Sequence, residues 1–201
     1  MTLSENSDAG FGKYARLERE RRFLLADLPE GLTRASEHLQ IWDNYITNTR
    51  LRLRQIRVPR TKEYTWKLTQ KFAPAPQDFS RTIITNIYLS RYEYEVMEVF
   101  AGNEIRKNRY PFEHQGRAFG IDVFLGPLWG LILAETSFDS DEEMDGFALP
   151  GFARLDVTND ELFTGGKLAY LSFDEIRAEL ERRAQGSSNS FQDRSERVQN
   201  G

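Results

Sequence analysis

Alternation of side chains with a period of two is the feature that most constrains the fold of this chain. Segment after segment places charged and apolar residues at alternate positions, as β-strands with two chemically different faces do. Many strands with few helices favour an antiparallel sheet that closes, or nearly closes, into a barrel, because closure removes exposed edges. We predict strands over residues 14–25, 45–58, 63–71, 82–89, 105–112, 120–125, 130–138 and 153–157.

Helical patterns are fewer, and two of them begin with a capping signal. Ser90 is followed three residues later by Glu93, and Ser172 by Glu175, which is the spacing of a capping box. We predict helices over residues 29–40, 90–100 and 172–183.

The length of 201 residues predicts one domain with a sizeable core. Both ends are polar, a composition that buries too little apolar surface to offset the entropy of ordering. We therefore expect a domain over residues 14–184, between disordered tails over residues 1–13 and 185–201.

The chain has no cysteine, two histidines and a net charge of −4. Disulfides, thiolate nucleophiles and cysteine-based metal sites are thereby excluded, so Mg²⁺ or Mn²⁺ on oxygen ligands is the more natural metal chemistry. The absence of cysteine fits a reducing compartment, and no apolar segment is long enough to cross a membrane. We expect a cytoplasmic protein with neither membrane nor nucleic-acid partners, since the overall charge is acidic.

The segment NTRLRLRQIR carries the most informative charged face. Arg50, Arg52 and Arg54 share one face of the predicted strand, while Leu51 and Leu53 lie on the other. Three like charges in a row repel one another unless anions neutralise them, and guanidinium groups suit bidentate contact with phosphate oxygens. The row predicts phosphate binding, with a solvated strand face as the alternative.

Carboxylates occupy two further strands. Glu18 and Glu20 share a strand face with Arg22 and lie roughly 7 Å apart along the backbone, so they can converge on one hard cation. Glu135 stands in the apolar segment GLILAETSF, where an unpaired buried carboxylate would be costly. Glu135 therefore needs a base, a metal or a position at the strand end. For Glu18 and Glu20 the alternative to metal binding is a solvated edge strand.

Two more strands carry basic faces, with Lys67 and Lys71 in TWKLTQK and Lys107 and Arg109 in IRKNRY. Each face alone is more typical of a solvated strand. Together within one barrel pattern, the charged faces favour an anion-binding interior.

The ordered set of motifs resembles the CYTH domains, also called triphosphate tunnel metalloenzymes. The family signature Glu-x-Glu-x-Lys is matched by Glu18, Glu20 and Arg22, and the resemblance covers roughly residues 14–183. It implies an eight-stranded antiparallel closed tunnel barrel of mainly β (α+β) class, with a few flanking helices including one at the C-terminus. Further resemblance lies in TRLRLR, WKLTQK, IRKNRY, GIDVFLGPLWGLILAE and LDVTND.

The resemblance also implies roles for individual residues. Family members hydrolyse tripolyphosphate, thiamine triphosphate or nucleoside triphosphates, and some cyclise ATP. Glu18, Glu20 and Arg22 would then be catalytic, and Glu18, Glu20 and Glu135 would bind Mg²⁺ or Mn²⁺. Phosphate-binding residues would be Arg52, Arg54, Lys67, Lys107, Arg109 and, near the tunnel mouth, Lys167.

Departures from the family pattern weaken the acidic half of the site. Arg22 replaces the signature lysine, Ser137 stands where a second late glutamate is expected, and RTIITNIYLS has no Glu-x-Glu. Fewer carboxylates should weaken metal binding, because fewer anions offset the bound charge.

Our leading hypothesis is a metal-dependent triphosphatase whose partner is a triphosphate-bearing small molecule or inorganic polyphosphate. A non-catalytic phosphate-binding module is the alternative, adenylate cyclase activity has less support, and a homodimer is left open. A nucleic-acid-binding barrel is disfavoured because the basic faces lack an aromatic stacking pattern.

Overall fold

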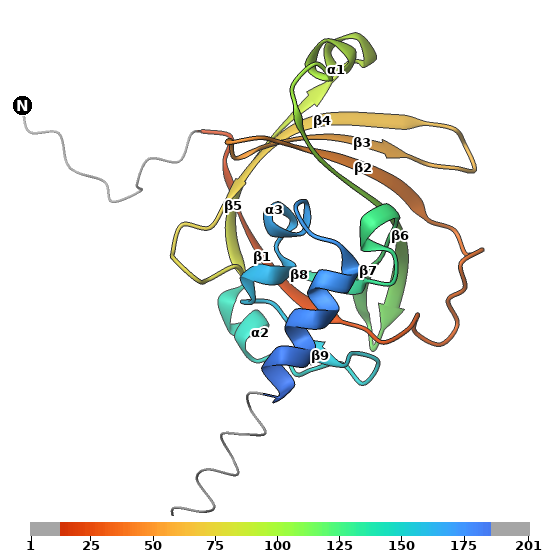
Figure 1. Cartoon of the computed structure of the whole chain (residues 1–201), viewed down its shortest axis with the longest axis vertical. Coiled ribbons are helices and arrows are strands. Elements are labelled where there is room, and N and C mark those ends of the chain that lie inside the picture. Colours follow the sequence, from red (N-terminus) through yellow and green to blue (C-terminus); the bar gives the residue numbers. More distant parts are fainter. Residues whose placement is uncertain (1–12, 186–201) are drawn as a thin grey trace, which may run out of the picture.

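Eight antiparallel strands form a closed barrel in the computed structural model, which describes residues 13–185. Closure occurs because β1 pairs with β5 along one edge and with β8 along the other. Figure 1 looks into this ring of strands, with α3 projected near its centre. The strands are β1 (Arg16–Leu24), β2 (Leu39–Ile46), β3 (Leu51–Arg57), β4 (Tyr64–Phe72), β5 (Arg81–Leu89), β6 (Gly102–His114), β7 (Arg117–Phe124) and β8 (Ile132–Phe138).

The remaining elements are short and lie around the barrel or at its end. Strand β9 (Leu155–Asp156) pairs with the end of β1, so the strand predicted over residues 153–157 is only two residues long. The helices are α1 (Arg91–Met97), α2 (Asp141–Asp145), α3 (Gly165–Leu168), two 3₁₀ turns, η1 (Gly126–Leu128) and η2 (Glu161–Phe163), and a C-terminal helix over residues 173–185.

Two of the predicted elements are wrong. The helix predicted over residues 29–40 is a chain of turns that leads into β2, because Gly31 has a positive φ of 88° and Leu32 N–H closes a turn onto the Pro29 carbonyl. The strand predicted over residues 45–58 is instead the end of β2, a turn with Asn48 at φ 59°, and β3.

Both predicted capping boxes are present. Ser90 accepts from the backbone N–H of Glu93, whose carboxylate accepts from the backbone N–H of Ser90 at 2.7 Å. Ser172 and Glu175 make the same reciprocal pair at the start of the C-terminal helix. The predicted helices over residues 90–100 and 172–183 therefore form, with small differences in length.

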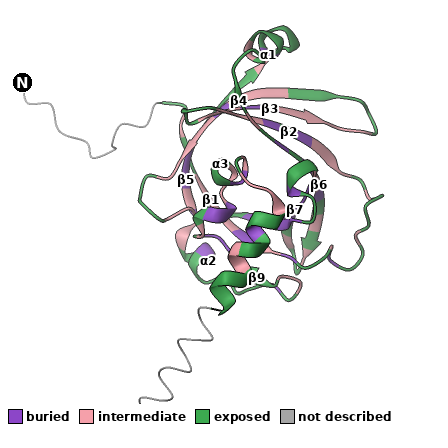
Figure 2. Ribbon diagram, in the orientation of Figure 1, coloured by how far each residue is buried: buried purple, intermediate pink, exposed green. Residues whose placement is uncertain are grey.

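Two apolar clusters hold the barrel. One lies between the barrel wall and the chain segments over residues 25–32 and 147–153, and includes Phe23 and Ile121. The other joins Ile176 of the C-terminal helix and Leu168 of α3 to barrel residues such as Leu133. Figure 2 shows buried residues along the strands, whereas α1 is largely exposed.

Within the described residues, no helix has the length and apolar character needed to cross a membrane. The predicted tails lie outside the described residues except for Lys13 and Gln185, the latter being the last residue of the C-terminal helix.

We predict that Ile176→Ala destabilises the protein by about 2–5 kcal/mol, because Ile176 is fully buried where the C-terminal helix meets the barrel. Urea unfolding measures this change. Val99→Ala, at a residue that is 79% exposed, is the control and should leave the unfolding midpoint unchanged. Equal midpoints for wild type and Ile176→Ala would show that the helix does not support the barrel.

Candidate phosphate-binding tunnel

The inward faces of the barrel strands enclose one chamber of about 480 Å³. Alternation along each strand sends the charged residues inward, so side chains distant in sequence line the same cavity. Lys167 does not line the chamber and is exposed on α3, beside the lining residues Gly166 and Leu168. The predicted site residues that do line it are Glu18, Glu20, Arg22, Arg52, Arg54, Lys67, Lys107, Arg109 and Glu135.

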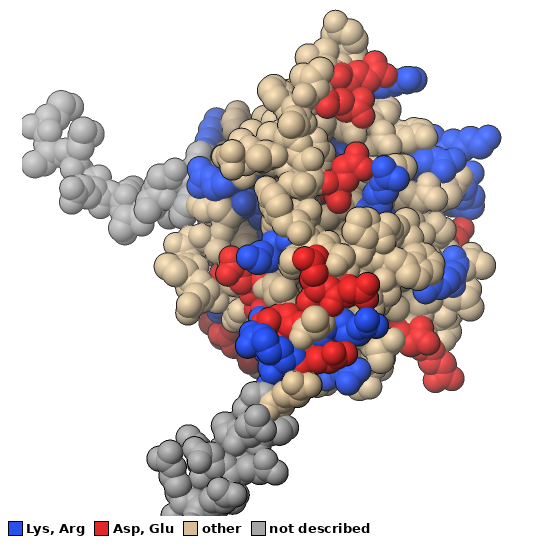
Figure 3. All heavy atoms as spheres, in the orientation of Figure 1, with Lys and Arg blue, Asp and Glu red and all other residues tan. Residues whose placement is uncertain are grey.

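The chamber holds more positive than negative charge. Eight of its lining side chains are Lys or Arg and five are Asp or Glu. Asp122, buried behind Lys107 and Arg109, leaves a positive excess when it is included. On the face shown in Figure 3, by contrast, basic and acidic side chains lie interspersed. An excess of buried cations is a ready binding site for an anion.

Asp43 of β2 neutralises part of the arginine row of β3. Its carboxylate, 1% exposed, accepts two hydrogen bonds from Arg54 at 2.5 and 2.7 Å, while Arg52 Nε lies 3.6 Å away. Burial alone would raise the pKa of Asp43, but Arg54 and Arg52 hold it well below its usual range. The carboxylate therefore stays ionised and fixes the Arg54 guanidinium.

Asp122 of β7 likewise neutralises Lys107 and Arg109 of β6. It accepts from Lys107 Nζ at 2.5 Å and from Arg109 Nε at 2.6 Å. Arg109 needs the absence of a side chain at Gly120, where a Cβ atom would lie 3.1 Å from Arg109 Cδ. Asp122 therefore neutralises both basic residues of this strand.

Glu135 of β8 finds the base that its position requires. It accepts from Arg22 Nε at 3.0 Å and also from Arg109. Burial would raise the pKa of Glu135, but Arg109, Lys107 and Arg22 hold it well below its usual range. Arg22 also donates to Glu20 at 3.2 Å, so one guanidinium links carboxylates of two strands.

Glu18 and Glu20 converge on a single cation, the ammonium group of Lys71. The Nζ atom lies 2.6 Å from Glu18 and 3.3 Å from Glu20. Burial lowers the pKa of Lys71, but these carboxylates raise it above its ordinary value. Within the described residues no three acidic or histidine side chains are grouped as a ready-made metal site. The two carboxylates can nevertheless face one positive charge together.

Lys67 and Arg52 are two chamber cations whose charge is only partly compensated. Lys67 makes no hydrogen bond or ion pair with the described residues, and it stands directly opposite Arg54 in the β3–β4 register. The Nε atom of Arg52 is buried without a hydrogen-bond partner. Burial, followed by Arg54 and Arg52, lowers the pKa of Lys67 to about 8. Phosphate oxygens between these side chains would relieve the repulsion.

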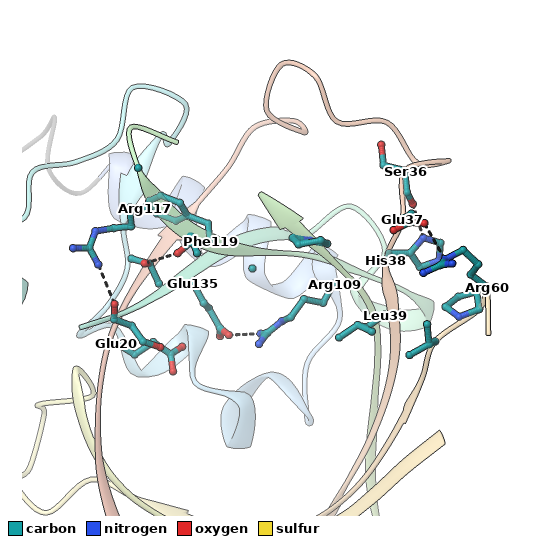
Figure 4. Close-up of a pocket in the computed structure, with 18 of the residues that line it drawn as sticks. Glu20, Ser36, Glu37, His38, Leu39, Arg60, Arg109, Arg117, Phe119 and Glu135 are labelled. Carbon is teal, nitrogen blue, oxygen red and sulfur yellow. Dashed lines mark hydrogen bonds and ion pairs between the residues drawn. The ribbon is translucent and has the colours of Figure 1, made fainter. Parts of the chain in front are cut away.

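A second cavity, which we call the vestibule, adjoins the chamber. It has a volume of about 950 Å³ and shares Glu18, Glu20, Arg109 and Glu135 with the chamber. Figure 4 shows Arg109 and Glu135 bonded at its inner side and the loop that carries His38 at its rim. The chamber therefore continues towards the surface through the vestibule.

Three contributors were absent from the predicted site: Asp43, Tyr45 and Lys71. Asp43 was missed because the predicted strand began two residues too late. Extending the alternation backwards from Tyr45 would have placed Asp43 on the inward face. Tyr45 packs so closely on α3 that a Cβ atom at Gly165 would lie 1.9 Å from its hydroxyl, a contact with no sequence signal.

Comparison with known proteins identifies the fold and its relatives. The chain is 28% identical over 158 residues to the inorganic triphosphatase of Nitrosomonas europaea, which covers 76% of this chain and 96% of that protein. The crystal structure of an inorganic triphosphatase superposes with a TM-score of 0.52 and 26% identity over 76% of this chain and 93% of the other. The chain is thus similar in sequence and in fold to an inorganic triphosphatase.

A second crystal structure of the same protein, there described as hypothetical, superposes with a TM-score of 0.53 and 25% identity over 77% of this chain and 99% of the other. No family model matches the chain. The expected closed barrel of eight antiparallel strands with few helices is confirmed.

We predict that Asp43→Asn costs about 3–5 kcal/mol of unfolding free energy at neutral pH, because it leaves buried Arg54 and Arg52 without their carboxylate. The pKa of Asp43 is lowered on folding, so its contribution is present above the unfolded pKa of about 3.9 and is lost as the pH falls. Urea unfolding at pH 7 and at pH 3 measures both effects.

The matched control for this substitution is Asp174→Asn, at a surface residue that pairs only with Arg177. It should leave stability unchanged at both pH values. An Asp43→Asn protein as stable as wild type at pH 7 would contradict the role assigned to this carboxylate.

Proposed function

We propose that the chain binds the phosphate chain of a triphosphate in the chamber and hydrolyses its terminal phosphoanhydride bond. The observation that carries the proposal is the positive charge at Lys67, which forms no ion pair with the described residues, and at Arg52, whose Nε atom lacks a hydrogen-bond partner. Both lie among further basic side chains. Such a cavity favours a linear polyanion over a neutral ligand. The relatives described as inorganic triphosphatases support the same reading.

Phosphate oxygens would bind in the chamber between the side chains that have free hydrogen-bond donors. Arg52 and Lys67 would contact the chain first, since their donors have no competing carboxylate within hydrogen-bond distance. Arg54, Lys107 and Arg109 are held by Asp43 and Asp122, and would contribute positive potential and their remaining donors. Preorganised cations are what phosphoryl transfer requires, because its catalysis is mainly positioning and charge stabilisation.

A divalent metal would be held by Glu18 and Glu20, with Glu135 as a third carboxylate. The fit rests on the convergence of Glu18 and Glu20 on the ammonium group of Lys71, which shows that both can serve one cation. When bound, Mg²⁺ or Mn²⁺ would neutralise phosphate charge and activate water. Arg22 holds Glu20 and Glu135 in place through hydrogen bonds.

No protein nucleophile is required for this reaction. The chain lacks cysteine, and its own residues would bind and orient the phosphate chain and hold Glu135 ionised. The choice of Mg²⁺ or Mn²⁺ and a cytoplasmic location are parts of the proposal that rest on the sequence.

A non-catalytic phosphate-binding module is the second candidate. It is favoured by the pairing of every predicted metal ligand with a lysine or arginine, since a metal must compete with Lys71 and Arg22. Adenylate cyclase activity has no comparable support from the site.

We predict that the wild-type protein releases phosphate from tripolyphosphate with Mg²⁺ or Mn²⁺, and that Glu18→Ala plus Glu20→Ala lowers kcat by about 100-fold or more. The variant should still bind tripolyphosphate, because the removed groups are anions. Phosphate release and calorimetric binding are measured in parallel, with Glu95→Ala plus Glu98→Ala on α1 as the control. Absence of turnover by wild type, or full turnover by the double variant, would refute hydrolysis at this site.

We predict that tripolyphosphate binding weakens as the pH rises above about 8, the pKa to which burial and the neighbouring arginines lower Lys67. Bound phosphate favours the charged amine and raises its pKa, so binding above this pH requires uptake of a proton. Affinity should fall by up to about tenfold per pH unit until the pKa of the complex is reached.

The control for this titration is Lys67→Arg, which keeps the positive charge throughout the range. Ionisation of the ligand itself affects both proteins equally, so the difference between their calorimetric profiles isolates Lys67. Parallel profiles between pH 7 and pH 10 would show that Lys67 does not contact the phosphate chain.

A further inference from the structure

The chamber and the vestibule reach the surface at opposite ends of β3. Arg50, directly before β3, lines the chamber, whereas Pro59 and Arg60, just after β3, line the vestibule. The seven residues of the strand separate these ends by about 23 Å at 3.3 Å per residue. The two approaches therefore lie far enough apart for their charges to be compared.

The approach beside Arg50, which we call the Arg50 mouth, presents a cation that forms no ion pair with a carboxylate of the described residues. Its exposed lining residues are Thr49, Arg50, Glu161 and Gly166. The Arg50 guanidinium lies 4.5 Å from the ring centre of Phe72, which holds it over the cavity wall. No carboxylate of the described residues forms an ion pair with Arg50 within 4.0 Å. This cation is available to a ligand.

The vestibule has the opposite character. Three of its lining residues are Lys or Arg and four are Asp or Glu. Its rim cations are already engaged, because Arg60 pairs with Glu37 at 3.1 Å and Arg117 pairs with Glu143. Figure 4 shows the Arg60 and Glu37 side chains meeting at the rim. A polyanion gains no uncompensated cation on this side.

The arginines of β3 have fewer and longer contacts with carboxylates the nearer they lie to the Arg50 mouth. Arg54 is held bidentately by Asp43, Arg52 lies 3.6 Å from the same carboxylate, and Arg50 has no acidic partner among the described residues. Successive members of the row are about 7 Å apart along the strand. The unneutralised charge thus continues from the chamber to the surface.

We propose that Arg50 is a further phosphate subsite, and that linear polyphosphates longer than tripolyphosphate leave the chamber through the Arg50 mouth rather than the vestibule. The inference rests on the proposed binding of a triphosphate in the chamber. It extends the ligand class to longer linear polyphosphates and gives the bound chain a direction.

The test compares dissociation constants for tripolyphosphate and for a longer linear polyphosphate, measured by calorimetry on the full chain at fixed ionic strength. Arg50→Met should weaken the longer chain about tenfold, the loss expected for one charged hydrogen bond, and change tripolyphosphate less than twofold. Arg60→Met, at the vestibule rim, should change neither constant. Circular dichroism and thermal unfolding check that both variants are folded.

Three outcomes would overturn the inference. Equal losses for both ligands would place Arg50 in the triphosphate site itself, an effect of Arg60→Met alone would reverse the direction, and no effect of Arg50→Met would remove the subsite. Each leaves tripolyphosphate binding by wild type intact. Failure of wild type to bind tripolyphosphate would instead refute the proposed function, and the inference with it.

Discussion

Neutralisation of charge inside a closed barrel is the constraint on which this structure depends. Three strands that carry inward cations, β1, β3 and β6, each have a neighbour that supplies a carboxylate, so these buried charges meet across the ladder. Register brings Asp43 opposite Arg54, Asp122 opposite Arg109 and Glu135 opposite Arg22. Opposed charges stabilise a strand pair, whereas a single buried charge left alone is strongly destabilising.

One opposed pair breaks this rule, and it marks the proposed ligand site. Arg54 and Lys67 face each other across β3 and β4, and no carboxylate bonds Lys67 among the described residues. Like charges directly opposite each other destabilise a sheet unless a third group intervenes. The like-charged pair thus lies where a phosphate chain would supply the missing negative charge. Function and local instability share one position, as is common at binding sites.

The barrel and the basic faces could be predicted from the sequence because both follow from alternation. Arg52 and Arg54 face inward together because residues two apart share a strand face. Which residues lie opposite one another depends on strand register, and alternation alone does not define register. The sequence indicated that a base was one possible partner of Glu135, but not that this base is Arg22. Asp43 was missed because the strand was predicted to begin at Tyr45, whereas β2 begins at Leu39. Residues 29–40 were taken for a helix, although Gly31 adopts a backbone angle that a helix excludes.

The acidic residues of the chamber can be interpreted in two ways, as ion-pair partners of its cations and as ligands of a metal. Glu18, Glu20 and Glu135 neutralise Lys71, Arg22 and Arg109, and the same oxygens are those proposed to hold a metal. Each of these carboxylates therefore already neutralises a cation of the chain itself. Catalysis then depends on how readily a metal displaces Lys71.

The most direct test of the central claim is a calorimetric titration of tripolyphosphate into wild type and into Arg52→Met plus Lys67→Met. We predict one binding site per chain in wild type and at least about 100-fold weaker binding in the variant, because two charge-assisted contacts are lost. Arg91→Met plus Arg106→Met, at exposed cations away from the chamber, should bind as wild type does. Undiminished affinity in the chamber variant would contradict the account.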